Sequence, residues 1–256
     1  MRAALRRWLA LVLLAAMIGV WELYVDSGGA DPLILPAPHA IAKSMYLDRS
    51  LLWSNFRVTA EEVLLGILLA ALAGFVLAIL IHLSATLRRA LYPLVLASQT
   101  VPVPIIAPVL LLWLGYGILP KLVVIALVSF FSIVVAMLAG LERVDPDLLK
   151  LMRTFDSSRL RTFRHVELPA SLPGLFTGAK IAVVVAVIGA VLAEQAGSNS
   201  GLGYLFEQSI AQVLTARAYA AVVILSLFAI SLFALLSAAQ RLALPWAHPP
   251  TGDRSQ

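Results

Sequence analysis

Long apolar runs separated by short polar stretches are the dominant pattern along the chain. A run of about 20 mostly apolar residues is long enough to cross the hydrocarbon core of a bilayer as an α-helix. The pattern predicts spanning helices over residues 8–25, 63–81, 91–114, 122–141, 174–193 and 218–240. We therefore predict an all-α membrane protein with about six transmembrane helices.

Composition supports this prediction. Hydrophobic residues make up 61% of the 256 residues and charged residues only 13%. A soluble domain of this length could not bury so much apolar surface, whereas lipid accepts it. The first run follows three arginines, as in a signal peptide, but it is long and no small-residue cleavage site closes it. We predict a single transmembrane domain over 1–256, with a retained N-terminal span at 8–25 and a core at 58–242.

Two polar stretches are predicted to be loops. The first, 31–55, contains Pro36 and Pro38, which lack the backbone N–H that a helix interior needs. It has room for one short helix along the membrane interface. The second covers residues 194–217.

The basic residues fall unequally on the two sides that six spans define. The side of the termini receives Arg2, Arg6, Arg7, Arg88, Arg89, Arg143, Lys150, Arg153, Arg159, Arg161, Arg164, Lys180, Arg241 and Arg254. The other side holds Lys43, Arg49, Arg57, Lys121 and Arg217. Because basic loops favour the cytoplasm, both termini and segment 142–173 are predicted to be cytoplasmic.

Residues suited to catalysis are sparse. The chain has no cysteine, which excludes thiol catalysis and Cys-ligated metals. None of its four histidines has a second histidine or a carboxylate at metal-binding spacing, and the adjacent Glu61 and Glu62 point to different helix faces. No Walker sequence for ATP and no basic patch interleaved with aromatic residues is present. We predict no catalytic residue, metal or cofactor, and no nucleic-acid partner.

Prolines interrupt the third apolar run. Pro102, Pro104 and Pro108 each remove a helix hydrogen bond and clash with the preceding turn. In lipid such a broken helix is tolerated where protein covers it or where it lines a cavity. We interpret Gln99, Thr100, Pro102 and Pro104 as part of a transport pathway. A packing kink, or a helix that starts at Pro102, is the alternative.

The polar segment 142–173 is too long for a simple connection between spans. Asp145 and Pro146 suit the N-cap and first position of a helix. Leu148, Met152 and Phe155 then share one helix face, at spacings of four and three. The segment is predicted to begin with a short amphipathic helix.

A second short helix is predicted after it. Ser158 can act as its N-cap, Leu160 and Phe163 extend the apolar face, and Pro169 and Pro173 are expected to stop it before the fifth span. This face can pack on the protein's own helix ends or on lipid headgroups, or it can dock in a groove of a cytoplasmic partner. The pattern alone favours neither.

At this segment the sequence resembles a known family. Residues 152–158 and 163–169, followed by Pro173, Gly174 and Gly178, are similar to the "EAA loop" of ABC importer permeases. That loop has the form E-A-A-x-x-x-G, a spacer, F-x-x-V-x-L-P, then P and G. Further similarity over 35–38, 99–108, 113–115, 145–146 and 200–205 extends it to most of the chain. It is greatest with the nitrate, taurine and sulfonate branch, which includes importers of riboflavin and thiamine-pyrimidine precursors.

The resemblance implies a type I importer permease of the bacterial inner membrane, which is not itself an enzyme. Two copies would pair with two cytoplasmic ATPase subunits, which bind ATP and Mg²⁺, and an external binding protein would deliver the solute. Segment 142–173 would then dock a coupling helix on the ATPase, which favours the partner interpretation. The resemblance assigns this contact to Arg153, Thr154, Phe155, Asp156, Ser157, Ser158, Arg159, Leu160 and Phe163.

Two departures from the family pattern affect this segment. Lys150 stands where the loop has Glu, so the cognate ATPase is expected to offer an acidic partner. Asp156 stands where it has Gly, and Asp tolerates a left-handed backbone better than most residues. The turn is therefore expected to survive.

The solute is less well defined than the family. Segments 99–108 and 189–204 look most similar to those of vitamin-precursor importers, so a thiamine pyrimidine or a riboflavin-like solute is expected, with taurine, a sulfonate or nitrate as the alternative. A secondary transporter would show inverted repeats and intramembrane charges, and a membrane-embedded enzyme would show clustered carboxylates or histidines. Neither pattern is seen in the predicted spans, where Lys180, one to two turns inside the fifth, is near enough to reach the interface.

Overall fold

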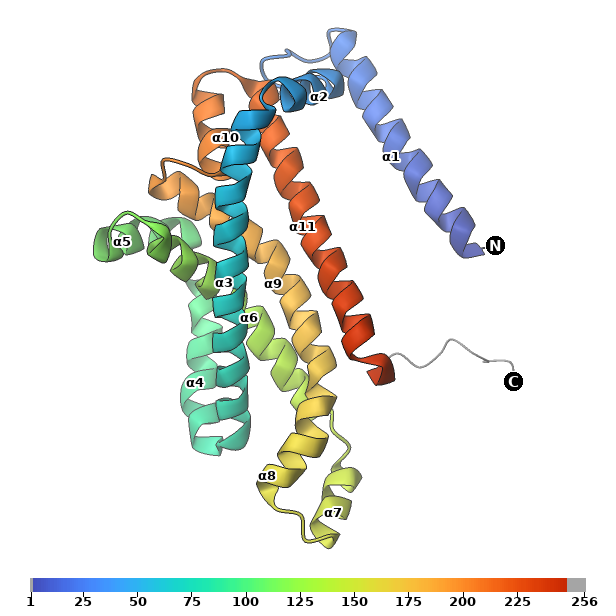
Figure 1. Ribbon diagram of the computed structural model, residues 1–256, viewed down its shortest axis with the longest axis vertical. Coiled ribbons are helices and arrows are strands. Elements are labelled where there is room, and N and C mark those ends of the chain that lie inside the picture. Colours follow the sequence, from blue (N-terminus) through green and yellow to red (C-terminus); the bar gives the residue numbers. More distant parts are fainter. Residues whose placement is uncertain (1, 248–256) are drawn as a thin grey trace. The chain divides into compact units, whose positions relative to one another are not determined.

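The computed structural model describes the backbone of residues 2–247 and the side chains of residues 8, 9 and 11–247 (Figure 1). Within this part of the chain the regular elements are all helices, with no strand, so the predicted all-α fold is confirmed. Arg2, Arg6, Arg7 and Arg254 of the predicted cytoplasmic side, and His248, one of the four histidines, lie outside the described side chains.

The helices follow one another with short connections. In chain order they are α1 (Arg2–Asp26), α2 (Pro38–Leu47), α3 (Arg49–Leu83), α4 (Ala85–Ala97), η1 (Ser98–Thr100), α5 (Val103–Leu114), α6 (Ile118–Glu142), α7 (Pro146–Thr154), α8 (Arg159–Thr162), η2 (Phe163–Glu167), α9 (Leu168–Gly197), α10 (Leu202–Ala211), α11 (Thr215–Ala243) and η3 (Pro245–Ala247).

Several of these helices can cross a membrane. Among the described residues, α3, α6, the continuous run Arg159–Gly197 and α11 are long and apolar enough. The run Ala85–Thr100 and α5 together make a fifth candidate, bent by 102° at the break between them. Helix α1 covers the predicted first span. The predicted total of about six is reached when α1 and the bent pair each cross.

The two predicted polar loops contain more helix than expected. Pro38 occupies the first turn of α2, where a backbone N–H has no intrahelical partner, so it starts this helix rather than preventing it. α3 begins at Arg49, well before the predicted span at 63–81. α10 lies within the stretch predicted as the loop 194–217.

The prediction that Pro169 and Pro173 stop a helix before the fifth span is wrong. α9 begins at Leu168, ahead of both prolines, and continues from α8 and η2. Pro169 lies in the first turn of α9, where a missing N–H has little effect. Pro173 lies inside the helix and removes one hydrogen bond without ending it.

The chain forms two compact units. One comprises Met1–Thr59 and Asn199–Ser226, and the other Ala60–Ser198 and Leu227–Gln256. α3 and α11 each continue from one unit into the other. The single domain over 1–256 stays a prediction.

In the larger unit, α6 and α9 pack closely because glycines allow their backbones to approach. A Cβ on Gly174 would lie 2.5 Å from the carbonyl oxygen of Ala136, and one on Gly178 would lie 2.6 Å from that of Ser132. Small residues are the usual means of close helix packing in membranes. The adjoining apolar core is formed by Ala78, Ile81, Val95, Val134, Met137, Leu138, Leu141 and Phe163.

The smaller unit joins the N-terminal helices to the segment before α11. The rings of Trp21 and Tyr219 are in contact, with their centroids 6.5 Å apart. The Thr215 hydroxyl donates a hydrogen bond to the carbonyl of Pro32 at 3.3 Å. These contacts connect α1 and the turn after it to the start of α11.

Candidate coupling segment and transport cavity

α7 begins as the sequence predicts. The Asp145 side chain accepts a hydrogen bond from the backbone N–H of Asp147 at 2.8 Å, and Pro146 follows it at the first helical position. An acidic N-cap satisfies an otherwise unpaired N–H and favours the positive end of the helix dipole.

α7 also ends in the expected left-handed turn. Asp156 has φ +52°. Its N–H donates to the carbonyl of Arg153 at 3.0 Å, and that of Ser157 donates to the carbonyl of Met152 at 3.1 Å. These two bonds form a Schellman motif, which requires a left-handed residue at this position. Asp156 therefore replaces the family's glycine without loss of the turn.

The second predicted helix is short and continues into a wider one. The Ser158 hydroxyl accepts a hydrogen bond from the N–H of Arg161 at 3.4 Å and caps α8, as predicted. The next five residues, η2, form a π-helix that leads directly into α9. Such single π-turns are frequently found at functional sites.

The predicted apolar face of this segment divides into two parts. Phe155 and Leu160 are 72% and 73% exposed. Phe163 is only 7% exposed and packs in the core with Ile81 and Met137. Phe163 therefore holds the segment to its own helices, while Phe155 and Leu160 present apolar surface outward.

Other residues assigned to the coupling contact serve local structure. The Thr154 hydroxyl donates to the carbonyl of Leu151 at 2.6 Å, and a guanidinium nitrogen of Arg159 donates to the carbonyl of Leu83 at 2.8 Å. The second contact fixes the start of α8 to the end of α3.

The break between η1 and α5 borders a cavity of about 140 Å³. Gln99 and Ser98 are its polar lining residues, and none of the lining residues described carries a charge. The lining comes from the break, α6 and α9, and consists of Ser98, Gln99, Val101, Val103, Ile106, Leu127, Val128, Val185, Ile188, Gly189 and Leu192.

The predicted pathway residues differ in whether they line this cavity. Gln99 lines the cavity, whereas Thr100, Pro102 and Pro104 are not among its lining residues. The Thr100 hydroxyl donates to the carbonyl of Ala97 at 2.8 Å. Pro102 is the N-cap of α5 and Pro104 lies in its first turn. A helix does begin at Pro102, as in the alternative interpretation. The break that precedes this helix also borders the cavity.

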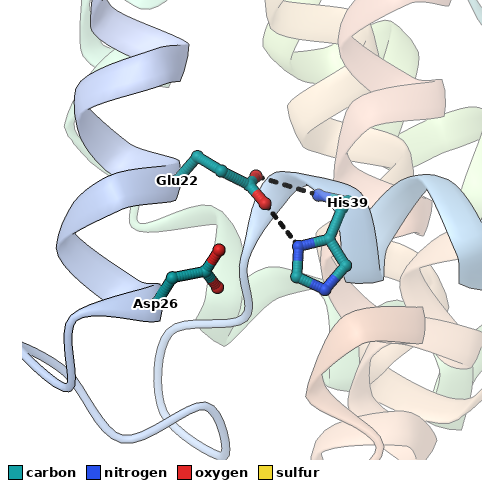
Figure 2. Close-up of side chains that lie close together, drawn as sticks. All are labelled: Glu22, Asp26 and His39. Carbon is teal, nitrogen blue, oxygen red and sulfur yellow. Dashed lines mark hydrogen bonds and ion pairs between the residues drawn. The ribbon is translucent and has the colours of Figure 1, made fainter.

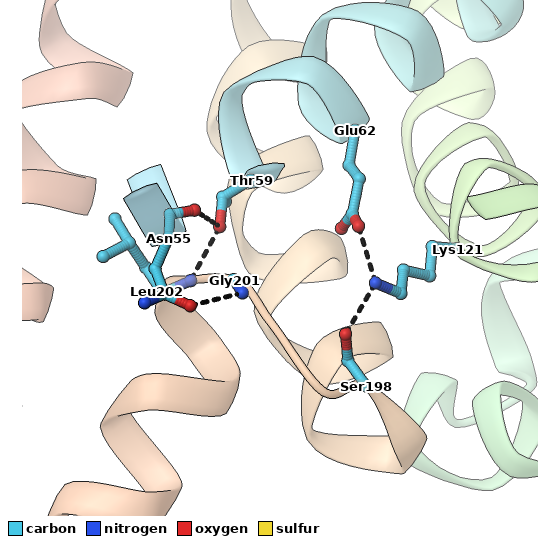
Figure 3. Close-up of polar contacts among 7 residues, drawn as sticks. All are labelled: Asn55, Thr59, Glu62, Lys121, Ser198, Gly201 and Leu202. Atoms are coloured by element: carbon cyan, nitrogen blue, oxygen red, sulfur yellow. Dashed lines mark hydrogen bonds and ion pairs between the residues drawn. The ribbon is translucent and has the colours of Figure 1, made fainter. Parts of the chain in front are cut away.

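In the smaller unit, side chains of α3 cap α10 (Figure 3). The N–H of Gly201 donates to the Asn55 side-chain oxygen at 2.9 Å, and the N–H of Leu202 donates to the Thr59 hydroxyl at 2.8 Å. Gly201 has φ +111°, which suits glycine. The sequence Gly201-Leu202-Gly203 is thus the start of a helix, and the N–H groups of its first two residues are already bonded.

Figure 2 shows a group that sequence spacing did not reveal, formed by Glu22, Asp26 and His39. One oxygen of Glu22 pairs with the His39 ring, and the other accepts from the His39 backbone N–H at 3.1 Å. The three side chains could together hold a metal ion, since their ligand atoms lie within 4.8 Å of one another. Asp26 and His39 are exposed, and capping of α2 by Glu22 accounts for the arrangement without an ion.

Sequence reasoning missed three buried charges at the edges of the predicted spans. Glu62, Lys121 and Glu194 lie within α3, α6 and α9 and are 2%, 7% and 1% exposed. Each lies one residue outside a predicted span, because the apolar runs were ended at the first charge while the helices continue. The stripe of small residues Gly66, Ala70, Gly74 and Ala78 was a usable signal, since Glu62 precedes it by one turn.

Comparison with known proteins establishes the family. The family model described as "Binding-protein-dependent transport system inner membrane component" matches residues 63–247. The chain belongs to this family. It is therefore a multi-pass protein of the bacterial inner membrane and a permease component of an ABC importer.

Curated relatives match nearly the whole chain. A probable ABC transporter permease protein of Haemophilus influenzae is 36% identical, over 87% of this chain and 91% of the relative. The formylaminopyrimidine transport permease protein ThiX of Halalkalibacterium halodurans is 34% identical, over 89% and 91%. The riboflavin transport system permease protein RibX of Chloroflexus aurantiacus is 30% identical, over 92% and 88%. Permeases named for aliphatic sulfonates (Bacillus subtilis) and taurine (Escherichia coli) each match at 27%.

A solved structure shares the fold. A chain of the MetNI methionine ABC transporter, described as inward-facing, superposes with a TM-score of 0.63 over 80% of this chain and 98% of that chain. The sequence identity is 19%, so this likeness supports the fold alone.

Proposed function

We propose that this permease forms the pathway of an ATP-driven importer for a small, uncharged nitrogen heterocycle, of the thiamine-pyrimidine-precursor kind. Two copies assemble with two ATPase subunits, which bind ATP and Mg²⁺, and with a binding protein outside the membrane. The observation that carries the solute class is the cavity beside the helix break, whose described lining has no charge.

The lining argues against anionic solutes. A sulfonate or nitrate taken from water into an apolar site needs cationic or several strong polar partners. Here the polar lining residues are Ser98 and Gln99 alone among those described. An amide and a hydroxyl suit the ring nitrogens and amino group of a neutral heterocycle.

Cavity size separates the two vitamin-related solutes. A buried apolar cavity of about 150 Å³ holds one benzene molecule. The cavity here measures about 140 Å³ and therefore suits a single six-membered ring. A pyrimidine fits this space, whereas the three fused rings of riboflavin would extend beyond it. The 34% identity to a formylaminopyrimidine permease supports the same choice.

The ATPase contact is proposed at α7 and α8. Phe155 and Leu160 are the most exposed large apolar side chains of α7, α8 and the turn between them, and such a face is how an amphipathic element meets a partner's groove. Asp156, Ser157 and Ser158 form the capped turn between the two side chains, and Arg153 accepts one of its hydrogen bonds. The partner is thus met by a rigid segment, which Phe163 anchors to the core.

Transport assays test the solute class. The chain is reconstituted in proteoliposomes with its ATPase and binding protein, and uptake of labelled formylaminopyrimidine, riboflavin and taurine is measured. We expect ATP-dependent uptake of the pyrimidine only. Gln99→Ala should raise the KM for uptake about threefold to tenfold, the worth of one hydrogen bond, while Thr100→Ala should not. Uptake of taurine, or uptake without ATP by this chain alone, would contradict the proposal.

Co-purification tests the ATPase contact. Phe155→Glu and Leu160→Glu should abolish recovery of the ATPase with the tagged permease. Ile34→Glu is the matched control, since Ile34 is an equally exposed apolar residue, at 74%, outside the segment. Full ATPase recovery with both coupling-segment variants would place the contact elsewhere.

A further inference from the structure

A buried charge cluster in the larger unit has no part in the proposed pathway or in the coupling segment. It contains Glu62 of α3, Lys121 of α6, and Glu194 and Ser198 at the end of α9. The Lys121 ammonium donates to one Glu62 oxygen, Oε1, at 2.6 Å and to the Ser198 hydroxyl at 2.7 Å (Figure 3).

The charges of this cluster do not balance. Glu62 and Lys121 neutralise each other, and the side chain of Glu194 also interacts with Glu62. Glu61, the neighbour of Glu62 on the same helix, adds a further repulsion. Two interacting buried carboxyl groups cannot both stay ionised without mutual repulsion and a large desolvation penalty.

One atom of the cluster lacks a partner. Among the described residues, no donor reaches Oε2 of Glu62, although this atom is fully buried. A buried acceptor without a donor is unusual in a folded protein. The neighbouring carboxyl of Glu194 can supply a donor, but only when it carries a proton.

We propose that the cluster is a proton-binding site, in which a proton held on Glu194 is shared with Oε2 of Glu62. The proton completes the hydrogen bonding of Glu62 and cancels the excess negative charge. Glu62 already accepts a short bond from the Lys121 ammonium at its other oxygen, Oε1, so the shared proton lies between Oε2 and the Glu194 carboxyl. The bound proton thereby links α3 to the end of α9, while Lys121 links both to α6.

Infrared spectroscopy of the purified full-length chain in nanodiscs tests the site directly. At neutral pH the wild type should show the carbonyl band of a protonated carboxylic acid, shifted by exchange into D2O. Glu194→Gln, which imitates the neutral acid, should remove the band and leave the Tm unchanged. Glu142→Gln is the control, because Glu142 is half-exposed and paired with Arg88, and this variant should keep the band. The absence of a band in the wild type, or a band that persists in Glu194→Gln, would overturn the proposal.

The pH dependence of stability provides a second test, independent of any variant's folding yield. A proton bound in the folded state and released on unfolding makes stability fall as pH rises. The wild-type Tm should therefore decrease from neutral to alkaline pH, and Glu62→Gln or Glu194→Gln should reduce this decrease. A Tm that depends on sodium concentration and not on pH would show that a metal cation occupies the cluster, and would refute the proton site.

Discussion

His82 at the end of α3 lies 3.1 Å from Glu167 in η2, measured between Nε2 and Oε2. Both side chains are mostly buried, at 20% and 17% exposed. Together with the bond from Arg159 to the Leu83 carbonyl, this contact joins the segment after the coupling helix to α3. A displacement of α7 and α8 by a partner would reach α3 through these contacts as well as through α9.

This arrangement predicts a coupling defect when the contact is removed. His82→Ala and Glu167→Gln should leave ATPase assembly intact and lower the solute imported per ATP hydrolysed severalfold, because motion of the segment is no longer passed to α3. Arg88→Ala, which removes the more exposed Arg88–Glu142 pair, is the control and should have little effect. An unchanged ratio of uptake to hydrolysis would show that α9 alone carries the coupling.

Because α6 and α9 pack closely, a methyl group added at Gly178 should lower the stability of the protein. Alanine in place of glycine usually stabilises a helix by about 1 kcal/mol. Gly178→Ala should instead destabilise the protein by about 1–3 kcal/mol, because the new Cβ would lie 2.6 Å from the Ser132 carbonyl oxygen. The Tm in detergent measures this effect. Gly19→Ala, with nothing within 4 Å of the added Cβ, should not lower it.

The caps on α10 predict a local change. Asn55→Ala or Thr59→Ala leaves a buried N–H of α10 without its acceptor, which costs about 1–3 kcal/mol. Hydrogen exchange at residues 201–205 should become faster by at least about fivefold. Ser54→Ala removes only an exposed hydroxyl bonded to its own helix and serves as the control. Unchanged protection in both variants would mean that the caps contribute little.

The left-handed turn at Asp156 predicts opposite effects for two substitutions. Asp156→Gly should keep uptake activity and stability, since glycine adopts φ near +52° without strain. Asp156→Val should destabilise the turn by about 1–2 kcal/mol and weaken ATPase recovery. The rate of limited proteolysis within segment 142–173 measures how far the turn has loosened. Equal cleavage of both variants would contradict the role of the turn.

The exposed ammonium of Lys150 predicts an acidic site on the ATPase. It is 71% exposed and bonded at 2.7 Å to the side chain of Asp147, one turn earlier. Lys150→Glu should weaken the permease–ATPase affinity about tenfold and reduce its salt dependence. Lys43→Glu, at an exposed position of α2, is the control. Unchanged affinity would remove Lys150 from the docking surface.

Local signals carried most of what could be predicted. Apolar run length located the spans, and N-cap chemistry located the starts of α7 and α8, since Asp145 and Ser158 accept from backbone groups two and three residues ahead. The left-handed backbone at Asp156 followed from its place in the family's loop. Each of these inferences depends on neighbours within a few residues.

The features that were missed depend on partners far away in the chain. Pairing of Glu62 with Lys121 joins residues 59 positions apart, and the caps from Asn55 to Gly201 span 146. A charged residue next to an apolar run is interpreted as the end of a span, unless a residue of opposite charge on another helix is known to pair with it. Without that knowledge neither the length of α3 nor the existence of α10 could be inferred.

The broken helix has a consequence for which chemical groups can cross. Pro102 and Pro104 carry no N–H, so the backbone beside the lining residues Val101 and Val103 has fewer donors than acceptors, and the Pro102 carbonyl already accepts from the N–H groups of Ile105 and Ile106. The break consequently offers little with which to bind an oxyanion. Under the proposed function, the wall of the cavity would therefore select against anionic solutes without carrying any negative charge.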